Sequence, residues 1–417
     1  MPKPSNDLQP KGSQWRSAPW LPAALLIFIQ IMSGMRDQPQ LAFFLIYLQE
    51  QLDLTPVTIS SVVAGAQIAG MVTALLGGAI AARLGIKWVL VCGLALSAVA
   101  SVVFQVHSLW LVVLLWLIGG AGMALVTVGG SSYLTQISER GALGILAAFY
   151  ALSITIGGAV GNPAAGAVIE RFGFGVYSWA VIALSAGIIL VVMFLMAHSQ
   201  NHVAKTVSLR ELWSGISTTA RERNVQFLVG LRCMPTIFYG MLSVHIPLLL
   251  NSLSGSKMTV ATYITTTLIV ASGAQLLTGR SADRWGGRIP TLVAYTVMII
   301  SGIGLAASAG TVWGLFGFGV AGIAAAWSLS TLMYVWVNDG VPKAEHPATF
   351  GLLHAVWSIS MITGSVVGSW LVSTTPGLSF LLAGLLNVGS LFLLLAYYNR
   401  ASIQAALNSR DLAKDTE

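Results

Sequence analysis

Long apolar runs dominate this sequence and restrict what it can fold into. Runs of this length match the thickness of a lipid bilayer when they are helical. A helix satisfies its backbone polar groups internally, whereas an open sheet in lipid does not. The sequence therefore predicts an all-α membrane protein with twelve transmembrane helices, at approximately residues 19–48, 57–82, 87–106, 109–136, 143–169, 176–197, 225–250, 259–281, 288–309, 312–338, 348–373 and 376–399.

Composition supports a membrane protein over a soluble one. The chain is 56% hydrophobic and only 8% charged, whereas soluble proteins are about 25% charged. The runs are apolar throughout, unlike the alternating strands of a porin-type barrel. We find no Cys/His metal spacing, no phosphate-binding loop and no catalytic nucleophile motif. We therefore expect no cofactor, no metal and no enzymatic activity.

One long polar stretch, residues 198–224, divides the chain into two sets of six spans. Within it, "SLRELWSGISTTARERN" is consistent either with a short amphipathic helix at the membrane surface or with a solvated linker. The expected organisation is a cytoplasmic tail, a six-helix half, a cytoplasmic central loop, a second half and a second cytoplasmic tail, at residues 1–18, 19–197, 198–224, 225–399 and 400–417.

The distribution of basic residues predicts the orientation. With the N-terminus inside, most of the 21 Lys and Arg residues fall on inner segments. Arg171 and Lys257 lie in outer loops, and Arg36 and Arg232 lie within spans. Because inner loops of membrane proteins carry the excess of Lys and Arg, we expect both termini in the cytoplasm and the protein in the plasma (inner) membrane. The same bias explains the net charge of +7 without a nucleic-acid partner.

The two halves carry matching sequence. "GGAIAARLGIKW" (Gly77–Trp88, the first basic stretch) and "TGRSADRWGGRI" (Thr278–Ile289, the second basic stretch) share glycines and basic residues at the same spacing. Span five also matches span eleven, since Ser153, Gly157 and Gly161 correspond to Ser360, Gly364 and Gly368. Two halves of the same topology predict a pathway on the axis between them.

Twelve spans in two halves, a long central loop and the repeated basic stretch together resemble the major facilitator superfamily. The resemblance covers nearly the whole chain and implies that the basic stretches act as cytoplasmic latches when the cavity faces outward. Ala82 stands where the family has Asp, so the second copy is the fuller one. The alternative is that both stretches only anchor the chain by the positive-inside rule. The matching residues are Gly78, Arg83, Gly85 and Lys87 in the first copy and Gly279, Asp283, Arg284, Gly286 and Arg288 in the second.

Span five carries "GGAVGNPAAG", which resembles a glycine-proline pattern that the family associates with antiporters. Asn162 takes a place where that pattern has Gly. The alternative is simple helix packing, because small residues let helices approach closely. The fourth helix departs from the family's exporters, since Trp116 stands where they often carry Arg. The residues of the glycine-proline pattern in span five are Gly157, Gly161, Asn162, Pro163 and Gly166.

Ionisable residues inside spans are costly, so each is a functional candidate. Arg36 and Asp37 lie together in span one, and Asp37 is the only carboxylate in the middle of a predicted span. Adjacent helix residues point about 100° apart, so we expect each to need another partner or a wet cavity. Asp37 is the candidate proton carrier, or else part of a structural ion pair with another helix. In span seven, Arg232 either receives an anionic substrate group or snorkels to the inner surface, and His245 is a second proton-coupling candidate.

The family resemblance implies that helices one, four, seven and ten line the cavity. Aromatic walls with scattered hydrogen-bonding groups suit an amphipathic organic substrate. Each aromatic residue taken alone is better explained by helix packing or by an interfacial belt, so only the group on inward-facing helices supports a cavity. The candidate cavity residues are Arg36, Tyr133, Arg232, Tyr239, Gln275, Trp327, Tyr334, His354 and Trp357.

These features predict a secondary active transporter, monomeric, working by alternating access and coupled to protons. The span-five pattern favours efflux of small amphipathic organic compounds by antiport. Three alternatives remain at this point. The first is a proton-coupled importer of a small organic anion that uses Arg36 and Arg232, the second is a lipid-linked flippase, and the third is a membrane sensor or scaffold that moves nothing.

Overall fold

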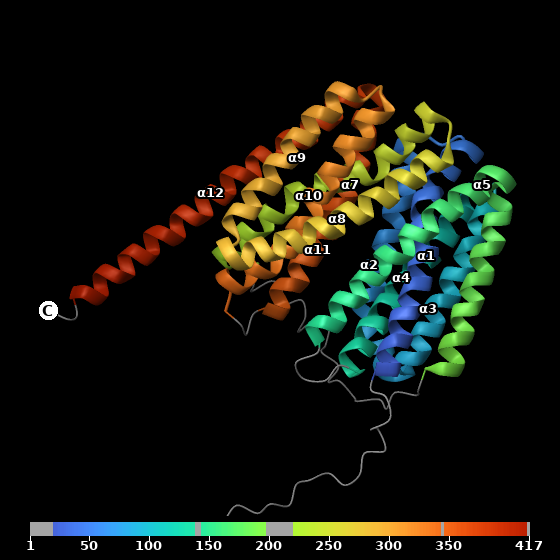
Figure 1. Cartoon of the computed structure of the whole chain (residues 1–417), viewed down its shortest axis with the longest axis horizontal. Helices are drawn as coiled ribbons and strands as arrows, with labels where there is room; N and C mark the ends of the chain where they lie inside the picture. Colours follow the sequence, from blue (N-terminus) through green and yellow to red (C-terminus); the bar gives the residue numbers. More distant parts are fainter. Residues whose placement is uncertain (1–19, 138–142, 197–219, 343–345, 415–417) are drawn as a thin grey trace, which may run out of the picture.

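A computed structural model describes residues 20–137, 143–196, 220–342 and 346–414 (Figure 1). Within these ranges every regular element is a helix and no strand occurs, as the sequence predicts. Residues 208–219, which make up most of the stretch expected as an amphipathic helix or a linker, lie outside these ranges. The elements are α1 Trp20–Gln51, α2 Pro56–Leu84, α3 Ile86–Ala100, the 3-10 helix η1 Ser101–Gln105, α4 Leu109–Ile137, α5 Leu143–Leu195, α7 Arg223–Ser254, α8 Lys257–Trp285, α9 Arg288–Ser308, α10 Val312–Gly340, α11 His346–Thr374 and α12 Pro376–Lys414.

The glycines of the two basic stretches end helices. Gly85 follows α2 with φ 83° and ψ 150°, and Gly286 follows α8 with φ 74° and ψ 170°. Each N–H donates to a carbonyl of the preceding turn, that of Ala81 or Ala282. A positive φ is strained for residues with a Cβ. The glycine two residues after the arginine, Gly85 or Gly286, is therefore required in both copies. It allows the sharp turn from α2 into α3 and from α8 into α9.

Two element boundaries differ from the sequence expectation. The predicted fifth and sixth spans form one assigned helix, α5, interrupted at Gly173, which has φ 81° and ψ 175°. Figure 1 shows α5 turning back on itself, so it still provides two passes. At the other end of the chain, α12 continues to Lys414, well beyond residue 399. Residues 400–414 include four Ala residues, which favour helix, together with Arg, Asp and Lys residues, which make the segment too polar to span lipid.

The predicted number of passes is confirmed for the part of the chain that the structure describes. Ten segments there are long and apolar enough to cross a bilayer, and one of them, Phe149–Leu195, has 47 residues and contains the Gly173 turn. α1 is not among the ten because its centre holds Arg36, Asp37 and several glutamines. Since α1 packs along α5 in the same bundle, it completes the twelve passes.

The helices form two bundles that correspond to the two halves of the sequence (Figure 1). We call α1–α5 the N-half and α7–α12 the C-half. Among the described residues, the hydrogen bonds between the halves gather toward the end where α1 finishes and α2 begins. We call this the seam end and the opposite end the open end. The seam consists of Gln49, Glu50, Ser60, Glu170, Asn251, Ser252, Ser256, Lys257 and Ser369, and one further hydrogen bond between the halves, from Thr155 to Ser272, lies midway along α8 and the first pass of α5.

Glycines bring equivalent helix pairs into direct backbone contact in both halves. A Cβ at Gly157 of α5 would overlap the carbonyl oxygen of Ile31 in α1. A Cβ at Gly364 of α11 would overlap the carbonyl oxygen of Ile237 in α7. These two glycines correspond in the sequence repeat. The repeat therefore preserves the packing of α1 on α5 and of α7 on α11, as small residues do in membrane bundles.

We expect Gly157→Ala and Gly364→Ala each to destabilise the protein. The added methyl group meets main-chain atoms that cannot rotate away, and overpacking of this kind costs about 1–3 kcal/mol. The measurement is the apparent unfolding temperature of purified protein, followed by tryptophan fluorescence. Gly187→Ala is the matched control, because its Cβ would meet nothing within 4 Å. Equal unfolding temperatures for the three variants would contradict the packing argument.

Candidate functional site

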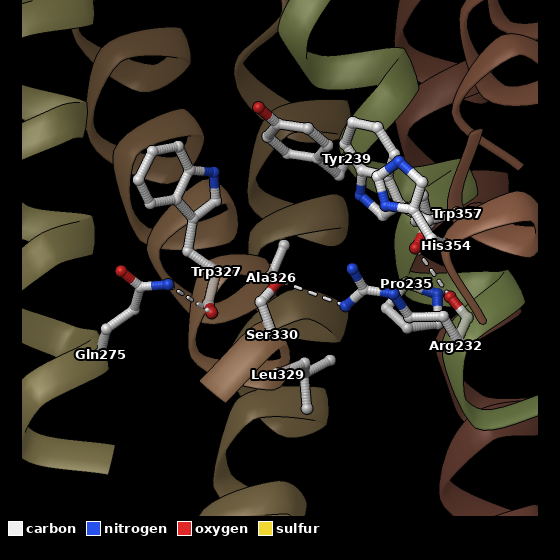
Figure 2. Close-up of a pocket in the computed structure, with 11 residues that line it drawn as sticks. Arg232, Pro235, Tyr239, Gln275, Ala326, Trp327, Leu329, Ser330, His354 and Trp357 are labelled. Carbon is white, nitrogen blue, oxygen red and sulfur yellow. Dashed lines mark hydrogen bonds between the residues drawn. The ribbon is translucent and has the colours of Figure 1, made fainter. Parts of the chain in front are cut away.

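A pocket of about 360 Å³ lies within the C-half, between α7, α8, α10 and α11 (Figure 2). Its volume falls at the low end of the roughly 300–1,000 Å³ typical of small-molecule sites. All of its lining residues are among those that the structure describes. They are Arg232, Pro235, Thr236, Tyr239, Gln275, Ala326, Trp327, Leu329, Ser330, His354 and Trp357.

The pocket lies partway along the helices, on the open side of the seam. Arg232 and His354 are about two turns from the beginnings of α7 and α11. Gln275 and Ser330 are about three turns from the ends of α8 and α10. These four helix termini all lie at the open end, so the pocket is about 12–15 Å from that end.

A second hollow, of about 450 Å³, lies between α8, α9 and α10. Its walls are mostly Ala, Leu, Val and Ile side chains. α9 packs on α8, α10 and α12, which are all in the C-half. This hollow lacks the convergent polar groups of a specific site, so the first pocket is the candidate functional site.

Arg232 supplies the charge of the candidate site. Its Nη1 donates to Ser330 Oγ at 3.1 Å, which fixes the guanidinium group between α7 and α10. Its Nε is buried without a hydrogen-bond partner among the described residues. Gln275 Nε2 donates to the carbonyl oxygen of Trp327 at 3.2 Å. The eleven lining residues contain one Arg, one His and no carboxylate.

Aromatic rings form the other walls of the site. His354 and Trp357 are stacked, with ring centroids 5.7 Å apart and 19° between their planes. Figure 2 shows Trp327 across the space from these two rings, with Tyr239 between them and the Arg232 guanidinium below. Flat rings on several sides favour a flat ligand, because aromatic groups stack in offset or edge-to-face arrangements.

The structure brings six of the predicted cavity residues together, namely Arg232, Tyr239, Gln275, Trp327, His354 and Trp357. Sequence analysis missed Thr236 and Ser330, although each lies one helical turn from a residue that it named. The sequence could not single out Pro235, Ala326 and Leu329, because apolar residues are common throughout these spans. Arg232 points toward α10 in this pocket, which does not match the alternative of snorkelling to the inner surface.

Three predicted cavity residues lie away from this pocket. Tyr133 is buried in a hydrophobic cluster of the N-half. Tyr334 is 68% exposed, and the centroid of its ring lies 5.1 Å from that of Phe350. Arg36 is fully buried in the N-half. Their roles in binding stay predictions, but no shared site with Arg232 is seen.

The expectation that Arg36 and Asp37 would not pair with each other is wrong, whereas the alternative of a wet cavity beside them stays a prediction. Arg36 Nε donates to Asp37 Oδ1 at 2.6 Å, so the two neighbours form an ion pair. The long arginine side chain bends back along α1 and overcomes the 100° between the two directions. Arg36 is fully buried and Asp37 is 18% exposed. Nη1 and Nη2 of Arg36 have no hydrogen-bond partner among the described residues.

His245 belongs to the seam region rather than to the pocket. Its Nε2 lies 3.3 Å from Ser369 Oγ of α11, and Ser369 Oγ in turn hydrogen-bonds Ser60 Oγ of α2. All three side chains are buried. This chain of contacts links a titratable side chain of the C-half to the N-half.

A network of charged and polar side chains joins the two halves at the more exposed part of the seam. Lys257 pairs with Glu50 across the two halves. Asn251 Nδ2 donates to the same Glu50 carboxylate at 2.8 Å, and Lys257 Nζ donates to Asn251 Oδ1 at 3.1 Å. Gln49 Nε2 donates to Ser252 Oγ at 3.2 Å. These contacts hold α1 against α7 and α8 at the seam end.

Lys87 and Arg284 of the basic stretches make contacts within their own halves. Lys87 Nζ donates to the carbonyl oxygens of Met193 and Met196, at 2.7 and 2.9 Å, and so caps the end of α5. Arg284 lies over the ring of Trp285, 5.7 Å from its centroid. Asp283 and Arg83 are exposed. The latch role of both stretches stays a prediction, because it concerns contacts between the halves at the open end.

The glycine-proline pattern of α5 faces two partners. Gly157 and Gly161 pack against the backbone of α1. A Cβ at Gly166 would lie 3.0 Å from Ala261 Cβ in α8, so this glycine packs across the two halves. Asn162 is fully buried, and Pro163 lies inside the helix. The packing explanation accounts for the glycines, and a link to antiport stays a prediction.

Comparison with known proteins agrees with this architecture. A family model described as Major Facilitator Superfamily matches residues 23–342. The structure is similar to the crystal structure of a mutant of the nucleoside transporter NupG, with a TM-score of 0.71 and 16% sequence identity. The match covers 89% of this chain and 99% of that one. At this identity the likeness concerns the fold. No curated protein sequence matches the chain significantly.

We expect Glu50→Gln to open the seam end. The substitution removes the ion pair with Lys257, and a partly exposed pair is worth up to about 1 kcal/mol. That free energy corresponds to about a fivefold change in the ratio of two conformations. The measurement is the distance between spin labels at Ser108→Cys and Thr311→Cys, in a background with Cys92 and Cys233 replaced by Ser. A longer distance should become more populated.

Asp53→Asn is the control for this measurement. Asp53 is exposed, lies close to Glu50 in sequence and has φ 50°, which Asn also tolerates. It should leave the distance distribution unchanged. An unchanged distribution in Glu50→Gln as well would show that the ion pair does not hold the halves together.

Proposed function

Because this chain belongs to the major facilitator superfamily, and is thus a multi-pass membrane transporter, we propose that it carries small amphipathic organic compounds by proton-coupled alternating access. The observation that carries this proposal is the position of the pocket. It lies on the open side of the polar seam, about 12–15 Å from the open end along the helices. A site reachable from one side at a time is what alternating access requires.

The proposed cycle follows from the two kinds of contact between the halves. Breaking the seam around Glu50 and Lys257 would let the halves rock apart at that end. Closing the open end would then bring the basic stretches of the two halves together, as latches. With the orientation that the basic residues predict, the open end would face the cytoplasm, and the conformation would correspond to an inward-facing state.

Two titratable groups inside the helical bundles, Asp37 and His245, support proton coupling. Asp37 is partly exposed in α1, and its only ion-pair partner among the described residues is the adjacent Arg36. Protonation of Asp37 would break that pair and leave Arg36 as an uncompensated buried charge, which is costly in lipid. His245 touches the inter-half contact through Ser369. A proton on either group would therefore change the packing of α1 or of the seam.

The direction of transport is the finer part of the proposal. The glycine-proline pattern of α5 favours efflux by antiport. The charge of the pocket favours the alternative of a proton-coupled importer for an organic anion, because Arg232 faces no carboxylate there. Both directions use the same site and the same cycle.

We expect Asp37→Asn to abolish substrate-driven proton movement. The amide cannot carry the proton, so substrate and proton fluxes would be uncoupled. The measurement uses purified protein in liposomes with an internal pH-sensitive dye, an imposed pH gradient, and cationic, neutral and anionic aromatic compounds added in turn. Asp53→Asn makes the same chemical change at an exposed site and should keep the wild-type response.

Each result separates the alternatives. Protons that move against the substrate support antiport, and protons that move with it support import. A full wild-type response in Asp37→Asn would exclude Asp37 as the carrier and direct attention to His245. A wild-type protein that moves neither protons nor any compound would favour a membrane sensor or scaffold.

A further inference from the structure

We propose that the pocket around Arg232 selects organic anions that carry an aromatic ring, and specifically an aromatic carboxylate. This inference rests on the proposed function, since it names the substrate class of the same site. The substrate would be negatively charged and flat, and Arg232 would be the residue that binds its anionic group.

The first argument is electrostatic. Arg232 lies in the C-half, about 12–15 Å from the open end along the helices. None of the residues that line the pocket is acidic. A cation in this pocket would meet a like charge with no carboxylate to balance it. An anion would instead neutralise Arg232 in surroundings of low dielectric, where ion pairing is strong and an unpaired charge is costly.

The second argument is the geometry of the guanidinium group. Ser330 occupies Nη1, and Nε, on the edge that it forms with Nη2, is buried without a hydrogen-bond partner among the protein residues described. This edge is the side on which arginine binds a carboxylate through two parallel hydrogen bonds. The contact to Ser330 also limits rotation of the group. The site is thus oriented for a planar anion, which lysine would not provide.

The third argument concerns the shape of the ligand. The carboxylate of a bound acid would lie at Arg232, and its ring would extend into the space bounded by Trp327, Tyr239 and the stacked pair His354–Trp357 (Figure 2). Ring-on-ring contact contributes about 0.5–1.5 kcal/mol beyond area burial. A saturated ring of the same size cannot gain this contribution.

Arg36 does not contribute to the pocket around Arg232. It is fully buried in the N-half and already pairs with Asp37. It lines no part of the pocket. A single anionic group therefore suffices for the substrate, and a dicarboxylate would leave its second charge unpaired.

The test compares matched compounds that separate charge from aromaticity. Binding to purified protein in lipid nanodiscs is measured by calorimetry for benzoate, benzamide, benzylamine and cyclohexanecarboxylate. The same comparison is repeated with indole-3-acetate, indole-3-acetamide and tryptamine. We expect each aromatic carboxylate to bind at least tenfold more tightly than its amide, and the amines to bind least. Cyclohexanecarboxylate should bind severalfold more weakly than benzoate.

Variants then assign the charge preference to one residue. Arg232→Gln should make acid and amide bind equally, and Arg232→Lys should keep part of the preference. Ser330→Ala should weaken carboxylate binding less than Arg232→Gln does. Arg171→Gln is the matched control, because Arg171 is exposed and far from the pocket in sequence. It should bind every compound like the wild type.

The outcomes distinguish this inference from the proposed function. Tighter binding of amines or amides, no binding of any carboxylate, or a carboxylate preference that survives Arg232→Gln would overturn it. Proton movement driven only by amines would keep the transporter and overturn the anion class. Carboxylate binding that depends on Arg232, without proton movement in liposomes, would support the anion class and contradict proton coupling.

Discussion

The structure depends on the close approach of helix backbones within each half. In lipid no water is available to backbone polar groups, so the chain must be helical and its helices must pack on one another directly. Gly157 and Gly364 allow this contact at equivalent places. The second contact also builds the site. Gly240, which meets α11, directly follows Tyr239, and Gly364 lies two turns beyond Trp357, so the glycine contact brings two pocket walls together.

The helical architecture could be predicted from sequence because its causes are local. Run length determines the passes, and the repeated stretches mark the ends of α2 and α8. Gly85 and Gly286 were identified by spacing alone, and the structure shows the positive φ that explains them. Most pocket residues could be named for a similar reason. Polar and aromatic side chains on helices seven, ten and eleven are rare enough to stand out in apolar runs.

The remaining features are set by contacts that local sequence does not encode. The pairing of Arg36 with Asp37 depends on how a long side chain bends, which helical spacing does not reveal. The seam joins Glu50 to Asn251 and Lys257, and Ser60 to Ser369, which are far apart in the chain. Serines of this kind are common in membrane helices, so no pattern distinguishes Ser369 from the others. Ser330 became recognisable only through its contact with Arg232.

Charged residues in the two halves affect which conformations the transport cycle can reach. The pocket cation, Arg232, belongs to the C-half, and the paired Asp37 belongs to the N-half. An empty pocket leaves Arg232 dependent on water, and closing both ends would remove that water at a high cost for an unpaired charge. A bound carboxylate removes this cost. Selection of an anion would therefore also determine which state can close, so that the loaded carrier crosses between its two conformations more readily than the empty one.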